Sequence, residues 1–164
     1  MADVFRTRTA NVFGKTEVKL VTDRPASKAA ILAGLDWMKS VMPGRLVAIF
    51  DACHSGAAAE SLQVGRTEGL VRDLLSDDCG VVVLCSSLGS EYSLEASVTK
   101  GGVFTFGLLE GLKGEADLNG DGFVFIDEVV LDAAVRVKQL TGGIQNPTLG
   151  RSPHVRPFPL ARGK

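Results

Sequence analysis

Cys53 stands among residues that suit a nucleophile. It follows the apolar run 45–51 (RLVAIFD) within the segment 51–56 (DACHSG), and the small residues around it leave space beside the sulfur. Open α/β sheets collect functional groups at the carboxyl ends of their strands, and backbone N–H groups entering a turn can stabilise a thiolate or an oxyanion. The residue is therefore a candidate catalytic thiol, with a buried structural thiol as the alternative interpretation.

Spacing argues against three other kinds of site at this position. A tyrosine-phosphatase phosphate loop requires arginine six positions after the cysteine, where this chain has Ala59. The nucleophile elbow of serine hydrolases requires glycine two positions on either side of the serine, but Ser55 has Cys53 before it and Ala57 after it. The sequence has no C-x-x-C pair, so neither a thioredoxin-like motif nor a zinc knuckle is predicted.

A second motif, residues 117–128 (DLNGDGFVFIDE), matches the twelve-residue calcium loop position by position. Ca²⁺ takes about six to eight hard oxygen ligands, and glycine at the sixth loop position makes the sharp turn. An acidic turn without metal is the alternative, and a paired EF-hand is not expected because the segment before the loop, 108–114, is short and rich in glycine. The predicted ligands are Asp117, Asn119, Asp121, the carbonyl of Phe123, and Glu128.

Strand-like and helix-like segments alternate along the chain, and they must position both motifs. This order predicts an α/β domain with a mainly parallel sheet, in which the apolar run before Cys53 is a central strand. We expect a surface loop over 88–100 and little regular structure from Thr141 onward. The predicted strands are 17–21, 45–51 and 80–87, and the predicted helices are 28–41, a short one near 70–75, 103–112 and 129–140.

Length and charge limit the classes of function. The 164 residues, 17.3 kDa, fit one domain. Eighteen Lys and Arg against 19 Asp and Glu leave a net charge of -1, which gives no bulk attraction to nucleic acid or an anionic membrane. No apolar run approaches the ~20 residues of a membrane span, the first residues do not resemble a secretory signal, and three cysteines suit a reducing compartment. We therefore expect a cytoplasmic protein.

Taken together, three segments resemble the caspase-like cysteine peptidases of bacteria, which are related to metacaspases. They are LVAIFDACHSG, GVVVLCSS with the residues that follow it, and GGVFTFGLLEGLKGEADLNGDG. The resemblance implies a caspase-like three-layer α/β domain over residues 1–150, with residues 151–164 as a C-terminal tail. It also implies a Cys-His dyad that cuts peptide bonds through an acyl-enzyme intermediate.

The resemblance gives roles to individual residues of this chain. It assigns Cys53 to the nucleophile position and Asp51 to the pocket for the side chain before the cut, where a carboxylate favours Arg or Lys. Glu91 falls where the family's loop borders the substrate groove. The alternatives are that Asp51 bonds the next turn and that Glu91 belongs to a solvated loop. The implied partner is a protein or peptide substrate, with Ca²⁺ as an implied cofactor and no organic cofactor.

The chain departs from the family at the catalytic base. The family's Gly-His-Gly strand is missing, because only Pro43 and Gly44 separate the helix from the nucleophile strand. Of the two histidines, His54 directly follows Cys53 and should point to the opposite face, and His154 lies in the tail. We therefore expect an incomplete domain, in which an unassisted thiol with a pKa of about 8.5 is only about 3% ionised at pH 7. The alternative function is a non-catalytic, calcium-responsive binding or regulatory relative.

Overall fold

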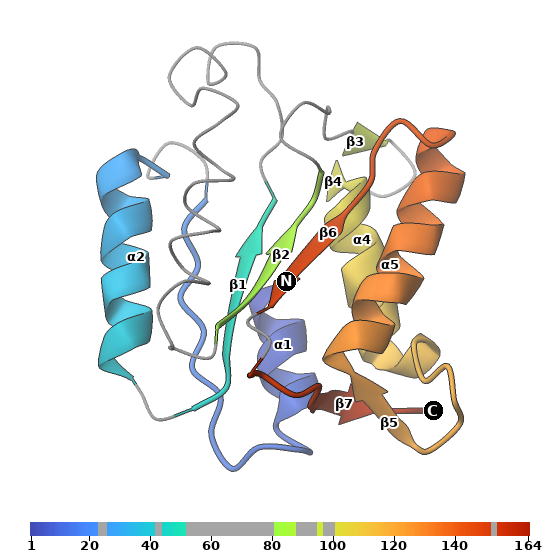
Figure 1. Ribbon diagram of the computed structural model, residues 1–164, viewed down its shortest axis with the longest axis horizontal. Helices are drawn as coiled ribbons and strands as arrows, with labels where there is room; N and C mark the ends of the chain where they lie inside the picture. The colour runs from blue at the N-terminus through green and yellow to red at the C-terminus, as the bar shows by residue number, and fades with distance from the viewer. Residues whose placement is uncertain (23–25, 42–43, 52–80, 88–94, 97–100, 152–153) are drawn as a thin grey trace.

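A three-stranded sheet lies at the centre of the computed structural model, which describes all residues except 23–25, 42–43, 52–80, 88–94, 97–100 and 152–153 (Figure 1). β1 (Leu46–Phe50) runs parallel to β2 (Val81–Cys85), and β6 (Thr148–Arg151) pairs antiparallel with the other side of β2. Both apolar strands were predicted. The described sheet is nevertheless mixed, not mainly parallel, and within it β1 is an edge strand, not a central one.

One face of this sheet is covered by α2 (Lys28–Ser40), which confirms the predicted helix (Figure 1). Ser27 caps its N-terminus, because the Ser27 Oγ accepts a hydrogen bond from the N–H of Ala30 at 3.2 Å. Leu35 and Met38 of the helix pack against the side chains that β1 and β2 present to this face. The helical spacing in the sequence therefore predicts the helix and the positions of Leu35 and Met38 on its packed side, whereas Leu32, predicted on the same side, is 44% exposed.

The other face is covered by α4 (Val103–Glu110) and α5 (Ile126–Thr141), which form the main core with β2 (Figure 1). The two helices pack closely where a Cβ on Gly107 would lie 3.4 Å from the Cα of Ala133. A π-helical turn, η1 (Gly111–Glu115), continues α4. Helices therefore lie on both sides of the sheet, and the protein is an α/β protein, as the alternation of elements predicts.

The helix α5 begins three residues before its predicted start, inside the 117–128 motif. Its first turn is closed by Glu128, whose carboxylate accepts the N–H of Phe125 at 2.9 Å. Asp127 and Glu128 in this first turn also favour the helix, because they face its partial positive charge. The last three residues of the motif, 126–128, therefore belong to the helix as well as to the motif.

The segment 17–21 is not a strand, contrary to the prediction. It has no regular structure, because no described strand pairs with its backbone. Its contacts are made by side chains instead: Lys19 donates to the carbonyl of Ala33 on α2 at 3.3 Å. Before it lies α1 (Ala2–Thr9), a helix that the sequence analysis did not predict.

The tail after α5 is also more regular than predicted. It supplies β6 to the central sheet, and it supplies β7 (Pro159–Arg162), which pairs antiparallel with β5 (Phe123–Phe125). Proline and glycine in the tail suggested a lack of structure, yet Phe158 is only 3% exposed in the main core. The prediction failed because strand pairing with β2 and β5 and burial in the main core, rather than local propensity, order these residues.

Two further predictions concern segments that the structure describes only in part or not at all. A two-residue strand, β3 (Glu95–Ala96), pairs with β4 (Gly101–Gly102), so the predicted loop over 88–100 contains part of a small hairpin. The predicted short helix near 70–75 lies outside the described residues.

Candidate functional site

Asp51 lies at the end of β1, at an edge of the sheet that we name the carboxyl edge and define by Phe50, Asp51, Cys85 and Ser86. The two parallel strands are in register here, with Phe50 beside Cys85. The pairing extends one step further, because the N–H of Ser86 donates to the carbonyl of Phe50 at 2.9 Å. The structure therefore places the start of the 51–56 motif at the edge where functional groups collect in α/β sheets.

The N-terminal end of α4 holds one oxygen of the Asp51 carboxylate. The Thr105 hydroxyl donates a hydrogen bond to Asp51 Oδ2. Gly102 lies so close that a Cβ on it would be 2.8 Å from the same oxygen. Since the N-terminus of a helix carries partial positive charge, the position also favours a carboxylate electrostatically. These contacts fix the direction in which the Asp51 side chain points.

The second oxygen, Asp51 Oδ1, is buried and receives no hydrogen bond from any residue that the structure describes. A buried carboxylate oxygen without a donor is costly, and such groups in native proteins call for a specific explanation. Oδ1 has the chemistry to accept a hydrogen bond from a cationic group on a bound molecule. The alternative interpretation, in which Asp51 bonds the next turn, concerns residues 52–80, which lie outside the description.

The other predicted residues of the peptidase site are not described by the structure. Cys53 and His54 fall within 52–80, and Glu91 falls within 88–94, so their roles stay predictions. The described His154 is exposed. Cys85 lies inside β2, where burial raises the pKa of its thiol more than a hydrogen bond with Thr148 lowers it. A thiol with a raised pKa suits a structural position, because the thiolate is the reactive form.

Sequence reasoning missed two polar residues near the carboxyl edge. Thr105 is the one hydroxyl in α4, where only Glu110 at the C-terminal end is also polar, and that isolation was the available signal. Gln145 is fully buried, and its Nε2 donates to the carbonyl of Ser86 at 2.8 Å. It lies in a segment rich in glycine with no periodic pattern to mark it. These two residues tie α4 and the segment after α5 to the carboxyl ends of β1 and β2.

The 117–128 motif, which we call the acidic loop, lies at the opposite end of the molecule from the carboxyl edge (Figure 1). Asp117 Oδ1 accepts the N–H groups of Gly120 and Asp121 at 2.9 and 3.1 Å, and Oδ2 accepts that of Gly122 at 3.0 Å. Gly120 and Gly122 have φ values of 73° and 85°, in the left-handed region that favours glycine. The first carboxylate of the motif therefore organises the tight turn that follows it.

The remaining predicted ligands extend this pattern along the loop. Asn119 Oδ1 accepts the N–H of Asp121 at 2.8 Å, and Asp121 Oδ1 accepts that of Phe123 at 2.9 Å. Glu128 joins the two ends of the loop, because its carboxylate accepts the N–H of Leu118 at 3.2 Å as well as that of Phe125. The loop is thus wound around the oxygen-bearing side chains of its own sequence.

The chemistry of this donor set fits a hard cation. Carboxylate, amide and carbonyl oxygens are the ligands that Ca²⁺ takes, and the residues that would hold it are the five named from the sequence. Within the described part of the chain, no group of three or more His, Cys, Asp or Glu side chains is arranged to hold a metal ion. Coordination would therefore require the carboxylates of Asp117, Asp121 and Glu128 to draw together.

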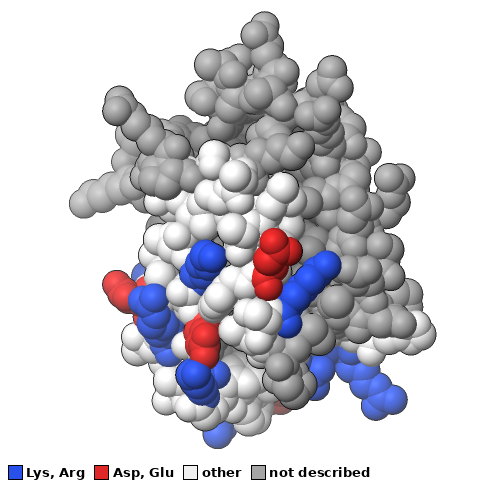
Figure 2. Space-filling view, turned by 90° about the vertical axis from the view of Figure 1, so that its left-hand side faces the viewer, with Lys and Arg blue, Asp and Glu red and all other residues white. Residues whose placement is uncertain are grey.

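The surface over α2 carries charges of both signs. On this side, the Lys and Arg side chains lie among Asp and Glu side chains and do not gather by sign (Figure 2). This distribution agrees with the net charge of -1 in the sequence. No helix in the described ranges is long and apolar enough to span a membrane.

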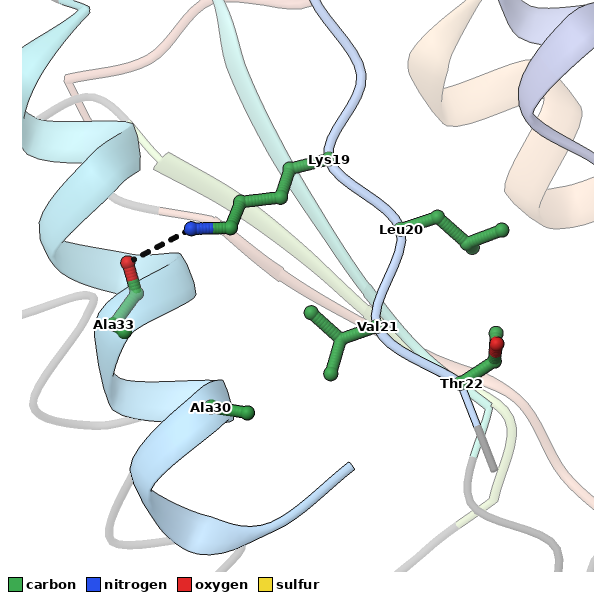
Figure 3. A pocket seen from close by; sticks show the side chains of 6 residues that line it. All are labelled: Lys19, Leu20, Val21, Thr22, Ala30 and Ala33. Carbon is green, nitrogen blue, oxygen red and sulfur yellow. Dashed lines mark hydrogen bonds between the residues drawn. The ribbon is translucent and has the colours of Figure 1, made fainter. Parts of the chain in front are cut away.

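A hollow of about 330 Å³ lies between the segment before α2 and α2 itself (Figure 3). Lys19 crosses it to reach the Ala33 carbonyl, and its Nζ lies 5.7 Å from the centroid of the Trp37 ring. The lining is mostly aliphatic and contains none of the predicted site residues. The hollow is therefore a junction between two segments, distinct from both candidate sites.

The assignment of a family depends on the chain's own residues. No family model matches the chain, and the comparisons with curated proteins and with solved structures give no match. The two candidate sites are therefore interpreted from their motifs and their geometry.

Proposed function

We propose that the chain is a cysteine endopeptidase of the caspase and metacaspase type, with a caspase-like three-layer fold, that cuts after Arg or Lys. The observation that carries the proposal is the position of Asp51, the first residue of the DACHSG motif, at the carboxyl edge, where the Thr105 hydroxyl donates to its carboxylate. Helices on both faces of the sheet support the proposed fold. Cys53 is the proposed nucleophile, and Glu91 borders the groove.

In the proposed reaction the Cys53 sulfur attacks the carbonyl carbon of the peptide bond. The C–N bond breaks, the amine leaves with a proton, and water then hydrolyses the thioester. In this proposal Asp51 Oδ1, which has no described hydrogen-bond donor, accepts a hydrogen bond from the positive group of the preceding Arg or Lys. Since the sequence lacks the family's dyad histidine, we expect turnover to be lower by a factor of about 10² to 10⁴.

The test combines turnover with covalent labelling, because labelling detects a slow enzyme. The full chain is incubated with Arg-terminated reporter peptides and with an Arg-containing peptide halomethyl ketone, with and without Ca²⁺. We expect one adduct at Cys53, located by mass spectrometry, and loss of cleavage and labelling in Cys53→Ala. Cys79→Ala is the matched control and should keep both. Absence of both cleavage and labelling in the wild-type chain would contradict the peptidase proposal.

A second candidate function is supported by the acidic loop: a calcium-responsive regulatory module without catalysis. The observation in its favour is the hydrogen-bonded winding of the loop, with the Glu128 carboxylate joined to N–H groups at both ends. When bound, Ca²⁺ would supply positive charge that draws the loop carboxylates together. The residues that would hold it are Asp117, Asn119, Asp121, Glu128 and the Phe123 carbonyl.

Calorimetric titration of the full chain with Ca²⁺ tests this candidate. We expect binding that Glu128→Gln weakens at least about tenfold, because one ligand of the set loses its charge. Asp127→Asn is the matched control: it changes the neighbouring carboxylate, which pairs with Arg151 at 3.2 Å and is not a predicted ligand. Equal affinities of wild type and Glu128→Gln would refute a calcium role for the loop. Calcium binding without labelling of Cys53 would favour this second function.

A further inference from the structure

The short strand within the acidic loop has a backbone partner far away in the sequence. β5 covers the seventh to ninth positions of the loop, and β7 pairs with it antiparallel, with Phe123 opposite Arg162 and Val124 opposite Ala161. Backbone N–H and C=O groups of an isolated strand need such a partner. The sequence offers no second calcium loop to provide one, so the tail provides it.

Backbone hydrogen bonds fasten the tail on both sides of this strand. The N–H of Gly163 donates to the carbonyl of Gly122 at 3.0 Å, and the N–H of Ile126 donates to the carbonyl of Phe158 at 3.0 Å. Gly122 is the turn glycine of the motif and Ile126 begins α5. The tail therefore spans the loop from its sharp turn to the start of the helix.

The tail also approaches the first predicted ligand closely. A Cβ on Gly163 would lie 2.2 Å from Oδ2 of Asp117, a distance that no Cβ can occupy without displacing that carboxylate. The next residue, Lys164, forms an ion pair with Glu115, two positions before Asp117. On the other side, the Arg162 guanidinium lies 4.4 Å from the centroid of the Phe123 ring. Three consecutive tail residues thus touch the loop or the residues beside it.

Apolar contacts anchor the tail independently of any metal. Phe158, Leu160 and Ala161 are 3%, 4% and 0% exposed within the main core. Their burial offsets the conformational entropy that the tail loses when it becomes ordered during folding. A loop that is already held in its wound form loses less freedom when a cation binds, and this preorganisation raises affinity.

From these contacts we propose that residues 158–164, the tail clamp, set the Ca²⁺ affinity of the acidic loop by standing in for a second calcium loop. The inference rests on the calcium function proposed above and adds its regulation. Coupling of this kind is reciprocal, so Ca²⁺ bound to the loop must stabilise the docked clamp by the same factor. Any process that pulls residues 158–164 off β5 would then release the cation.

The test is a Ca²⁺ titration of the full chain carrying Gly163→Ala, measured by calorimetry. We expect the dissociation constant to rise roughly 10- to 100-fold, the range for losing a group that orients a metal ligand. Gly34→Ala is the matched control, because that glycine lies in α2 with no heavy atom within 4 Å of an added Cβ. Its affinity should equal that of the wild type. Circular dichroism establishes that both variants are folded.

A second variant and a second measurement separate the possible outcomes. Lys164→Gln removes the exposed ion pair with Glu115 without adding an atom near Asp117. We expect a smaller change in affinity than in Gly163→Ala, because a looser clamp weakens binding whereas loss of a positive charge beside the loop favours Ca²⁺. In the wild type, Ca²⁺ should slow hydrogen exchange at the N–H of Gly163, which bonds Gly122. Unchanged affinity in both variants, with the wild type binding, would overturn the clamp and leave the calcium function standing. A wild type that binds no Ca²⁺ would overturn both.

Discussion

The carboxyl edge and the acidic loop are built in different ways. The edge is assembled from distant parts of the chain: Asp51 follows β1, and Thr105, which donates to it, is 54 residues further along the sequence. In the acidic loop, the side-chain hydrogen bonds to N–H groups of the motif join residues that lie close together in the sequence. The largest such separation is ten residues, between Leu118 and Glu128. The first site therefore depends on the tertiary fold, and the second carries most of its organisation in its own sequence.

The difference has a consequence for how each site responds to damage. A site that depends on tertiary packing is lost when the helices that hold it loosen, whereas a local loop keeps its turn as long as its glycines and carboxylates remain. The two sites nevertheless share a support, because α4, which holds Asp51, packs along α5, which begins inside the loop. The tail clamp adds long-range contacts to the loop, as does the ion pair between Asp127 and Arg151.

The largest expected effect comes from weakening that shared support. Leu108 of α4 is fully buried in the main core. We expect Leu108→Ala to lower the free energy of unfolding by about 2 to 5 kcal/mol, because it removes buried methyl groups and leaves a cavity. Urea denaturation followed by circular dichroism measures the change. Leu131→Ala on α5 is the control, since Leu131 is 58% exposed and should change stability by no more than about 0.5 kcal/mol.

This variant also decides whether the two sites belong to one folding unit. If they do, the fluorescence of Trp37 on α2 and the Ca²⁺ response of the acidic loop should be lost at the same urea concentration in Leu108→Ala. Two separate transitions would contradict the view that α4 supports both sites.

A smaller effect is expected from Thr105→Val, which acts on the carboxyl edge alone. The substitution keeps the shape of the side chain but removes the hydrogen bond to Asp51 Oδ2. We expect a loss of about 1.5 to 3 kcal/mol in the free energy of unfolding at pH 7, the value for a hydrogen bond to a charged group. Thr105→Ser keeps the hydroxyl and should lose less. The Ca²⁺ affinity should not change, and a change would show that the two sites are coupled.

The elements around the sites could be predicted wherever one stretch of sequence determines them. The helix α2 is an example, because the capping residue Ser27 and the apolar residues with helical spacing lie within one segment of sequence. The buried strands β1 and β2 are further examples. The segment 17–21 has the composition of a strand, but no described strand pairs with it. β6 and β7 show the opposite case, because their partners β2 and β5 lie far away in sequence and order a tail rich in glycine and proline.

The same limit applies to the candidate sites. The acidic loop could be located from the sequence because its motif is contiguous, while its calcium ligands stay predictions. At the carboxyl edge the sequence indicated Asp51, but not Thr105 or Gln145, since nothing in a single sequence pairs a hydroxyl in α4 with a carboxylate after β1. The tail clamp could not be foreseen either, because it depends on Gly163 meeting a loop that precedes it by about forty residues of folded chain.

The smallest expected effect is electrostatic and reports the last contact of the clamp. The Lys164 ammonium, through a hydrogen bond and its charge, holds the pKa of the Glu115 carboxyl below its usual value. A carboxyl whose pKa is lower in the folded protein contributes stability above its unfolded pKa, and this contribution is lost as the pH falls through the folded pKa. We therefore expect Lys164→Gln to raise the titration midpoint of Glu115, followed by NMR in acid.

Added salt should reduce the difference between the two proteins, because the pair is exposed. Lys113→Gln removes the neighbouring Glu110 pair and should leave the midpoint of Glu115 much closer to that of the wild type. Equal midpoints in wild type and Lys164→Gln would mean that Lys164 does not rest beside the acidic loop, and the clamp would then end at Gly163.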